Sequence, residues 1–169
     1  MGRQCFSSFL LFGLFFLAAA FVGCEKSTSP IESKYPPDNA HKVTITQGVW
    51  GNVWFLEGNF EPSLGRTSGK ITPVVREILV YEATRRDQAE PPGDYFFTAI
   101  HTNRIASVFS DEDGFYQIPL PPGKYSLFVR EDSLYIATGD DGEGVLFPVV
   151  VKEGQVTRAD IKIDYKATY

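Results

Sequence analysis

The chain has 169 residues, 43% of them hydrophobic, and carries a formal net charge of −5 at pH 7. This balance disfavours nucleic acid as a partner, because attraction to phosphates needs a basic face and the basic residues form no cluster beyond Arg85-Arg86. The two cysteines, Cys5 and Cys24, both precede the predicted fold. The fold itself is therefore expected to hold no disulfide, no cysteine metal site and no cysteine nucleophile.

The chain begins like a secretion signal. Arg3 is followed by a dense apolar run over 9–22, which is shorter than the roughly 20 residues that span a bilayer core as a helix. The run ends in Ala20-Phe21-Val22-Gly23-Cys24, which resembles the bacterial lipobox, where a small residue precedes a lipidated cysteine. The resemblance implies that residues 1–23 are removed and that Cys24 carries lipid. The plain alternative is that Cys24 is simply a cysteine near the end of a signal peptide.

The segment that follows is expected to be a flexible tether. Residues 24–42 are rich in Ser, Thr, Pro, Lys and Asp, and Pro30, Pro36 and Pro37 prevent a regular helix or a central strand. A coil of this length spans about 23 Å on average, which lifts a domain clear of the lipid headgroups.

One all-β domain is predicted over 43–169. The residues after the tether form short segments rich in Val, Ile, Phe, Tyr and Thr, which alternate with clusters of Gly, Pro, Asn and Asp. Alternation places Tyr116, Ile118 and Leu120 on one strand face and Tyr125, Leu127 and Val129 on another, and these two faces are expected to form one core. The predicted strands, about seven in number, are 43–47 running into 48–56, 75–83, 104–110, 115–120, 124–130, 145–152 and 155–164.

Short turns connect several of these strands. The turn at 111–114 ends in a glycine suited to a hairpin, 121–123 reads Pro-Pro-Gly, and 152–155 is predicted to join 147–151 and 156–163 as a closing hairpin. Two longer irregular stretches, 57–72 and 84–94, are predicted loops, and loops of that length are often functional. An interaction surface is expected there.

The run from Ser110 to Leu127 resembles the carboxypeptidase regulatory-like domain, a transthyretin-like module. It contains the Asp-x-Asp-Gly-x-Tyr turn at 111–116 and the Pro-Pro-Gly-x-Tyr sequence at 121–125. Gly48–Val53 is similar to the opening strand of that family, and 149–151 and 160–163 to its closing strands. The resemblance implies a seven-stranded Greek-key β-sandwich.

The same resemblance bears on function. In this family the module is generally an accessory, non-catalytic unit attached to peptidases, outer-membrane receptors and surface proteins. The segment 57–62 and the ending 165–169 are similar to small lipoproteins of the Bacteroidetes that carry the module. We therefore expect a lipoprotein of the cell envelope, in the outer membrane, that faces either the periplasm or the cell surface.

Candidate catalytic and metal-binding residues are few. The histidines are His41 and His101, so an imidazole zinc site would need both to converge. A Ser-His-acid arrangement around His101 stays open, because its members need be neighbours only in space. The acidic runs 111–113 and 140–144 partly resemble calcium loops, but neither completes the ligand spacing. A hairpin turn explains the first run, and a solvated acidic loop explains the second. Pilus modules with a Lys–Asn bond place an acid in the strand after Pro-Pro-Gly, where 125–129 has none.

Trp50 and Trp54 are the candidate binding surface. In the strand 48–56, Val49, Val53 and Phe55 share one face and the tryptophans share the other. This strand is therefore either buried on both sides or presents a tryptophan pair to a partner. The aromatic residues at 95–97 are further candidates for a sugar-stacking platform, although aromatic residues in strands more often belong to the core.

These patterns favour a non-enzymatic, lipid-anchored β-sandwich that serves as a structural or interaction module. No cofactor is expected, and the expected partners are the membrane, through Cys24, and an envelope protein or glycan. The alternative is a surface glycan-binding lipoprotein that uses Trp50 and Trp54. A third option is a small hydrolase that depends on His101.

Overall fold

The computed structural model describes residues 35–36, 38–61, 68–91, 93 and 95–169. They belong to a compact unit that runs from Ser33 to Tyr169. The predicted signal peptide, Cys24 and the first part of the predicted tether lie outside the described residues. Within the described ranges, no helix is long and apolar enough to cross a membrane.

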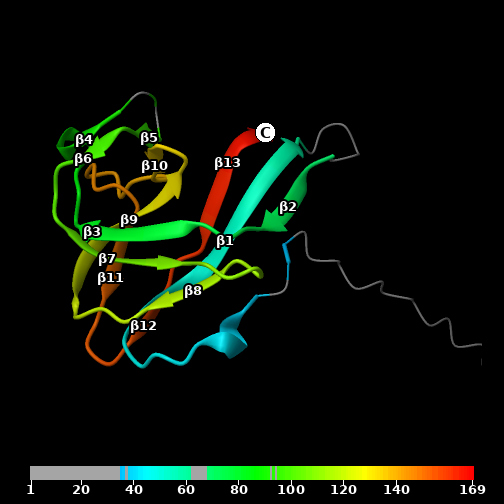
Figure 1. Ribbon diagram of the computed structural model, residues 1–169. Helices are drawn as coiled ribbons and strands as arrows, with labels where there is room; N and C mark the ends of the chain where they lie inside the picture. Colours follow the sequence, from blue (N-terminus) through cyan, green and yellow to red (C-terminus); the bar gives the residue numbers. More distant parts are fainter. Residues whose placement is uncertain (1–34, 37, 62–67, 92, 94) are drawn as a thin grey trace, which may run out of the picture. The chain divides into compact units, whose positions relative to one another are not determined.

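The first sheet is organised around β1 (Gly48–Asn59), its longest strand (Figure 1). One side of β1 pairs in parallel with β12 (Val156–Arg158) and then with β13 (Ile161–Thr168). The other side pairs antiparallel with β8 (Phe115–Ile118) and β2 (Lys70–Pro73). The strand thus has neighbours on both sides along most of its length.

The second sheet has the order β5-β10-β9-β3-β7, with β11 also beside β9. Its strands are β3 (Glu77–Glu82), β5 (Phe96–Phe97), β7 (Arg104–Phe109), β9 (Gly123–Glu131), β10 (Leu134–Ile136) and β11 (Pro148–Val151). A small ribbon pairs β4 (Ala89–Glu90) with β6 (Ala99–Ile100). Two short 3₁₀ turns are η1 (Ala40–Lys42) and η3 (Arg86–Gln88).

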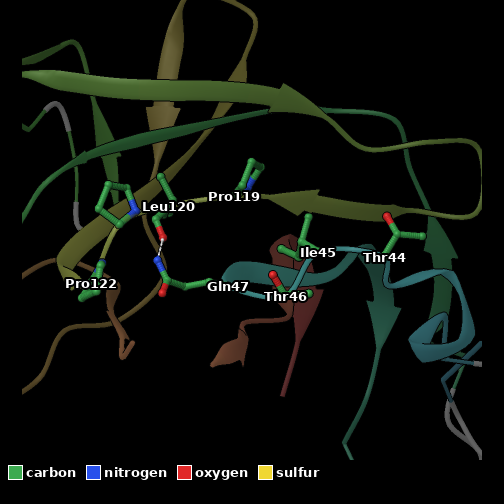
Figure 2. Close-up of a pocket in the computed structure, with 8 residues that line it drawn as sticks. Thr44, Ile45, Thr46, Gln47, Pro119, Leu120 and Pro122 are labelled. Atoms are coloured by element: carbon green, nitrogen blue, oxygen red, sulfur yellow. Dashed lines mark hydrogen bonds between the residues drawn. The ribbon is translucent and has the colours of Figure 1, made fainter. Parts of the chain in front are cut away.

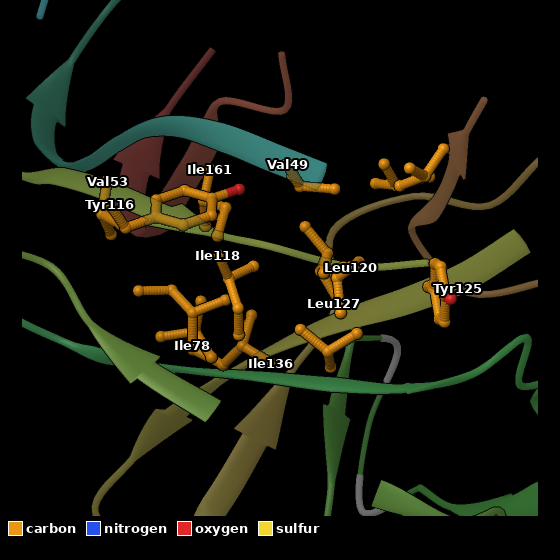
Figure 3. Close-up of a cluster of buried hydrophobic side chains, with 14 of the residues drawn as sticks. Val49, Val53, Ile78, Tyr116, Ile118, Leu120, Tyr125, Leu127, Ile136 and Ile161 are labelled. Carbon is orange, nitrogen blue, oxygen red and sulfur yellow. The ribbon is translucent and has the colours of Figure 1, made fainter. Parts of the chain in front are cut away.

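The main core lies between the two sheets (Figure 3). The six alternating residues predicted to face inward are all buried in it, three from β8 and the residues after it and three from β9. The all-β sandwich class is therefore confirmed. Tyr116 is 1% exposed, and its hydroxyl donates a hydrogen bond to the Ala159 carbonyl at 2.5 Å. Burial raises the pKa of this phenol.

A second apolar cluster covers the opposite face of β3 and β9. Leu79 and Phe128 are fully buried there against Phe97 and Leu146. The residues that cover them come from the predicted loop 84–94 and from the segments around 96–100 and 137–147. The long connections of the second sheet therefore extend the core instead of projecting as free loops.

The predicted turns form, but they join strands in different ways from those expected. Gly114 has a φ of 77° and Gly154 a φ of 64°, as turn glycines do. However, the turns at 111–114, 121–123 and 152–155 each connect one sheet to the other. The predicted closing hairpin is wrong, because β11 pairs with β9 while β12 pairs with β1.

One two-residue hairpin escaped prediction. β9 and β10 pair antiparallel, with Glu131 opposite Leu134, so that Asp132 and Ser133 form the loop. Asp132 adopts a φ of 52°, a left-handed conformation that aspartate tolerates better than most residues. No glycine or proline marks this turn in the sequence.

Three predicted boundaries differ from the structure. The segment 43–47 is not a strand, because the side-chain oxygen of Gln117 accepts the backbone N–H groups of Thr44 and Ile45. The predicted loop 57–72 contains the end of β1 and all of β2. The predicted loop 84–94 contains η3 and β4. The sandwich therefore has more strands than the seven expected.

Candidate interaction surfaces

The tryptophan pair lies on the outer face of β1, as predicted, but it is covered. Trp50 is 9% exposed and Trp54 is 5% exposed. Of the two alternatives for this strand, the structure therefore has the one in which both faces are buried. The pair does not form an open stacking platform, which corrects its assignment as an exposed binding surface.

The cover is the segment 35–42, here called the strap, of which Pro37 is not described. The ring of Tyr35 packs on Trp54 with centroids 4.7 Å apart. Asp38 forms an ion pair with Arg158 at 2.8 Å, and the Arg158 guanidinium lies 4.9 Å from the Trp50 ring centroid. The later part of the predicted tether is thus packed against the sandwich.

A buried amide fixes the strap. Asn39 is 6% exposed, and its side-chain nitrogen donates to Asn52 Oδ1 at 2.7 Å and to the Asp113 carbonyl at 3.0 Å. Asn52 in turn donates its backbone and side-chain N–H groups to Asp160. This network joins the strap, β1 and the segment before β13, and it leaves the Asn52 amide oxygen satisfied in a fully buried position.

The candidate acidic turns are occupied by protein contacts. Lys42 Nζ lies 2.9 Å from Asp111 and 2.5 Å from Asp113, which raises the pKa of the lysine through hydrogen bonds to both carboxylates. Lys124 Nζ lies 2.8 Å from Asp141. Among the described residues, no group of three or more His, Cys, Asp or Glu side chains is arranged to hold a metal ion.

The two histidines have different surroundings. His101 Nε2 is 3.0 Å from a carboxylate oxygen of Glu90, and its side chain is 56% exposed. His41 is an exposed residue of η1. The remaining aromatic candidates are distributed: Phe97 is fully buried, while the rings of Tyr95 and Phe96 lie 5.2 Å apart with Tyr95 36% exposed.

A groove of about 580 Å³ lies where the strap leads into β1 (Figure 2). It is lined by residues 44–47 on one side and 119–122 on the other. Gln47 Nε2 donates to the Leu120 carbonyl at 3.0 Å across it, and Gln47 Oε1 accepts the Gly154 N–H. The side chains around it are those of threonine, isoleucine, leucine, proline and one glutamine, so the described lining carries no charge.

Among the described strands, the edge strand β7 exposes two large apolar side chains. It pairs with β3 on one side and ends the strand order of the second sheet. Ile105 is 45% exposed and Phe109 is 66% exposed. The stretch Ile105–Phe109 carries no charge, whereas edge strands are usually guarded by charges, prolines or bulges. One such feature is present, a register shift at Val80/Tyr81 opposite the start of β7.

β7 was predicted as a strand over 104–110 but not as an interaction surface. Its alternation of apolar and small polar residues is typical of a strand with one buried face, and Ala106 and Val108 do pack on the core. Its position at the edge depends on which strands pair, and the local pattern does not encode this. The usable signal was the pair of large apolar residues, Ile105 and Phe109, on the face opposite the core.

Comparison with known proteins adds no assignment: no protein-family model, no curated protein and no solved structure matches the chain.

Proposed function

We propose that this protein is a lipid-anchored module of the bacterial cell envelope that works by binding another protein and not by catalysis. The lipobox-like ending at Cys24 supports the anchor, and the likeness of residues 48–165 to the carboxypeptidase regulatory-like module supports the non-catalytic role. The observation that carries the proposal is the uncharged stretch Ile105–Phe109 of the edge strand β7, with its two exposed apolar side chains.

An edge strand of this kind is chemically suited to one type of partner. Its outward backbone N–H and C=O groups can accept another strand, and Ile105 and Phe109 add apolar contact on one face. The anchor would keep this surface near the membrane. Ten residues lie between Cys24 and Tyr35, and a fully extended chain over that span reaches about 35–40 Å.

The test is site-specific photo-crosslinking in intact cells. Benzoylphenylalanine in place of Phe109 is expected to give a cross-linked adduct of defined mass, and the same residue in place of Glu153, in the exposed turn after β11, is expected to give none. Absence of an adduct at position 109 in the full-length, membrane-bound protein would refute the proposed binding role.

The anchor has its own control. Cys24→Ser is expected to move the protein from the detergent-soluble membrane fraction to the aqueous fraction, because acyl chains contribute about 0.8 kcal/mol per buried CH₂. A variant that stays with the membrane would show that Cys24 is not the anchor.

A further inference from the structure

We propose that the partner of β7 is β7 of a second copy of this chain, paired antiparallel across a two-fold axis. This inference rests on the proposed binding role of the same strand and specifies the partner. Three features carry it: the direction of the free backbone groups, the symmetry of the exposed side chains, and the charges at the two ends.

The free backbone groups define the register. Ser110 donates its N–H to the Arg76 carbonyl in the ladder with β3. Because hydrogen-bonding direction alternates along an antiparallel strand, the N–H and C=O groups of Ser107 and Phe109 point away from β3. They are the groups that a new strand would bind. A two-fold axis at Ser107 lets Ser107 bond to Ser107 of the second copy and places Phe109 opposite Ile105, the residue that the register shift leaves without a partner on β3.

The exposed side chains suit this symmetry. Ser107 is small and exposed, and it lies between the two large apolar residues. In the antiparallel register, Ile105 of each copy lies opposite Phe109 of the other, and directly opposed residues lie on the same sheet face. Each apolar side chain therefore gains an apolar neighbour, and the serines at the axis leave room for the chains to approach. Isologous pairing of this kind closes on itself and leaves no further edge at β7.

The charges favour the antiparallel direction. Arg104 stands at the start of β7 and Glu112 in the turn that follows it, and neither forms an ion pair with any residue that the structure describes. Antiparallel pairing at Ser107 brings Arg104 of each copy opposite Ser110 of the other, next to the turn that carries Glu112. Parallel pairing would instead place the two arginines together, where like charges repel.

The test uses thiol cross-linking of the full-length protein in cells. Directly opposed Cα atoms in a hydrogen-bonded antiparallel pair lie about 5.5 Å apart, so Ser107→Cys places two thiols across the axis within reach of a short bismaleimide. A dimer band several-fold stronger than that of Glu153→Cys and of the unmodified protein is expected. Phe109→Lys added to Ser107→Cys is expected to abolish the band, and circular dichroism of the purified variant checks that the sandwich is intact.

Each result has a defined meaning. A Ser107→Cys protein that stays monomeric, or a dimer that forms equally well through Glu153→Cys, overturns self-pairing. An adduct between position 107 and a protein of different mass also overturns it, but leaves the broader binding role standing. Loss of every adduct at both 107 and 109 overturns both proposals together.

Discussion

Single side chains explain how the acidic loop at 140–144 is held. Asp141 Oδ1 accepts the backbone N–H groups of Glu143 and Val145, each at 3.0 Å, and Asp141 Oδ2 accepts from Lys124 Nζ. The hydrogen bond from Lys124, followed by that from Val145, lowers the pKa of Asp141 from 3.8 to about 2. A loop that resembles a cation site in sequence is in fact held by its own amides and one lysine.

This depressed pKa gives a pH dependence with a definite sign. The ionised form is favoured in the fold, so its contribution to stability is complete above pH 3.8 and is lost as the pH falls towards 2. Lys124→Met is expected to raise the pKa of Asp141 towards 3.8, as measured by NMR titration of its carboxyl carbon. Lys152→Met, in the exposed turn after β11, is the control and should leave it unchanged. An unaltered pKa in Lys124→Met would assign the shift to the backbone amides alone.

At the scale of elements, the contact between β1 and the segment before β13 depends on one glycine. A Cβ atom added at Gly51 would lie 2.0 Å from the Ala159 carbonyl oxygen and 3.0 Å from the ring of Tyr116. The Ala159 N–H donates to the Trp50 carbonyl at 2.8 Å, which draws the two backbones together. Backbone atoms on both sides make this close approach rigid.

Gly51→Ala is therefore expected to lower the free energy of unfolding by about 1–3 kcal/mol through overpacking, as measured by chemical denaturation. Gly93→Ala is the matched control, because a Cβ atom there has no atom within 4 Å, and its effect should stay within about 0.5 kcal/mol. Equal stability of the two variants would show that β1 and the segment at 159 separate at little cost.

The elements also show what the sequence could and could not predict. Alternation identified the inward faces around Tyr116 and Leu127 because a buried strand face has the same period in any sheet. The pairing partners were missed because a short turn such as 152–155 looks the same whether it returns a strand to its own sheet or crosses to the other. The β9–β10 hairpin was missed because Asp132 adopts a conformation that glycine usually signals.

At the scale of the whole molecule, the strap is the segment whose composition predicted its structure least well. Its prolines and polar residues are typical of a tether, and the domain was therefore predicted to begin at residue 43. The segment from Tyr35 onward is instead part of the folded domain. The side chain of Asn39 holds it there, because its partners at 52 and 113 lie far away in the sequence, in β1 and in the turn before β8. Local composition does not reveal contacts with distant strands. For the same reason Trp50 and Trp54 were candidates for an exposed binding surface, although they are buried.

Fluorescence can test the strap, since the chain has only two tryptophans: Trp54 packs against Tyr35 of the strap, and Trp50 packs against Arg158, which is paired with Asp38 of the strap. Asp38→Ala combined with Asn39→Ala removes the contacts to Arg158, Asn52 and the Asp113 carbonyl. We expect tryptophan emission to move to longer wavelength, while the far-ultraviolet circular dichroism of the sheets is retained.

The control for the strap variant is Asp87→Ala, because the Asp87 side chain is 78% exposed and lies 3.8 Å from Arg85. It should not change the emission. If the double variant also keeps the emission of the unmodified protein, the tryptophans are protected by the sheet and by Arg158 rather than by the strap.

The parallel pairing of β1 with β12 and β13 also sets the timing of folding. The bond between Asn52 and Asp160 joins positions 108 residues apart, so the central strand of the first sheet is synthesised long before the strands on its parallel side exist. Topologies dominated by such distant pairings fold slowly. The first sheet can therefore be completed only after the last strands of the chain have been made, however early β1 leaves the ribosome.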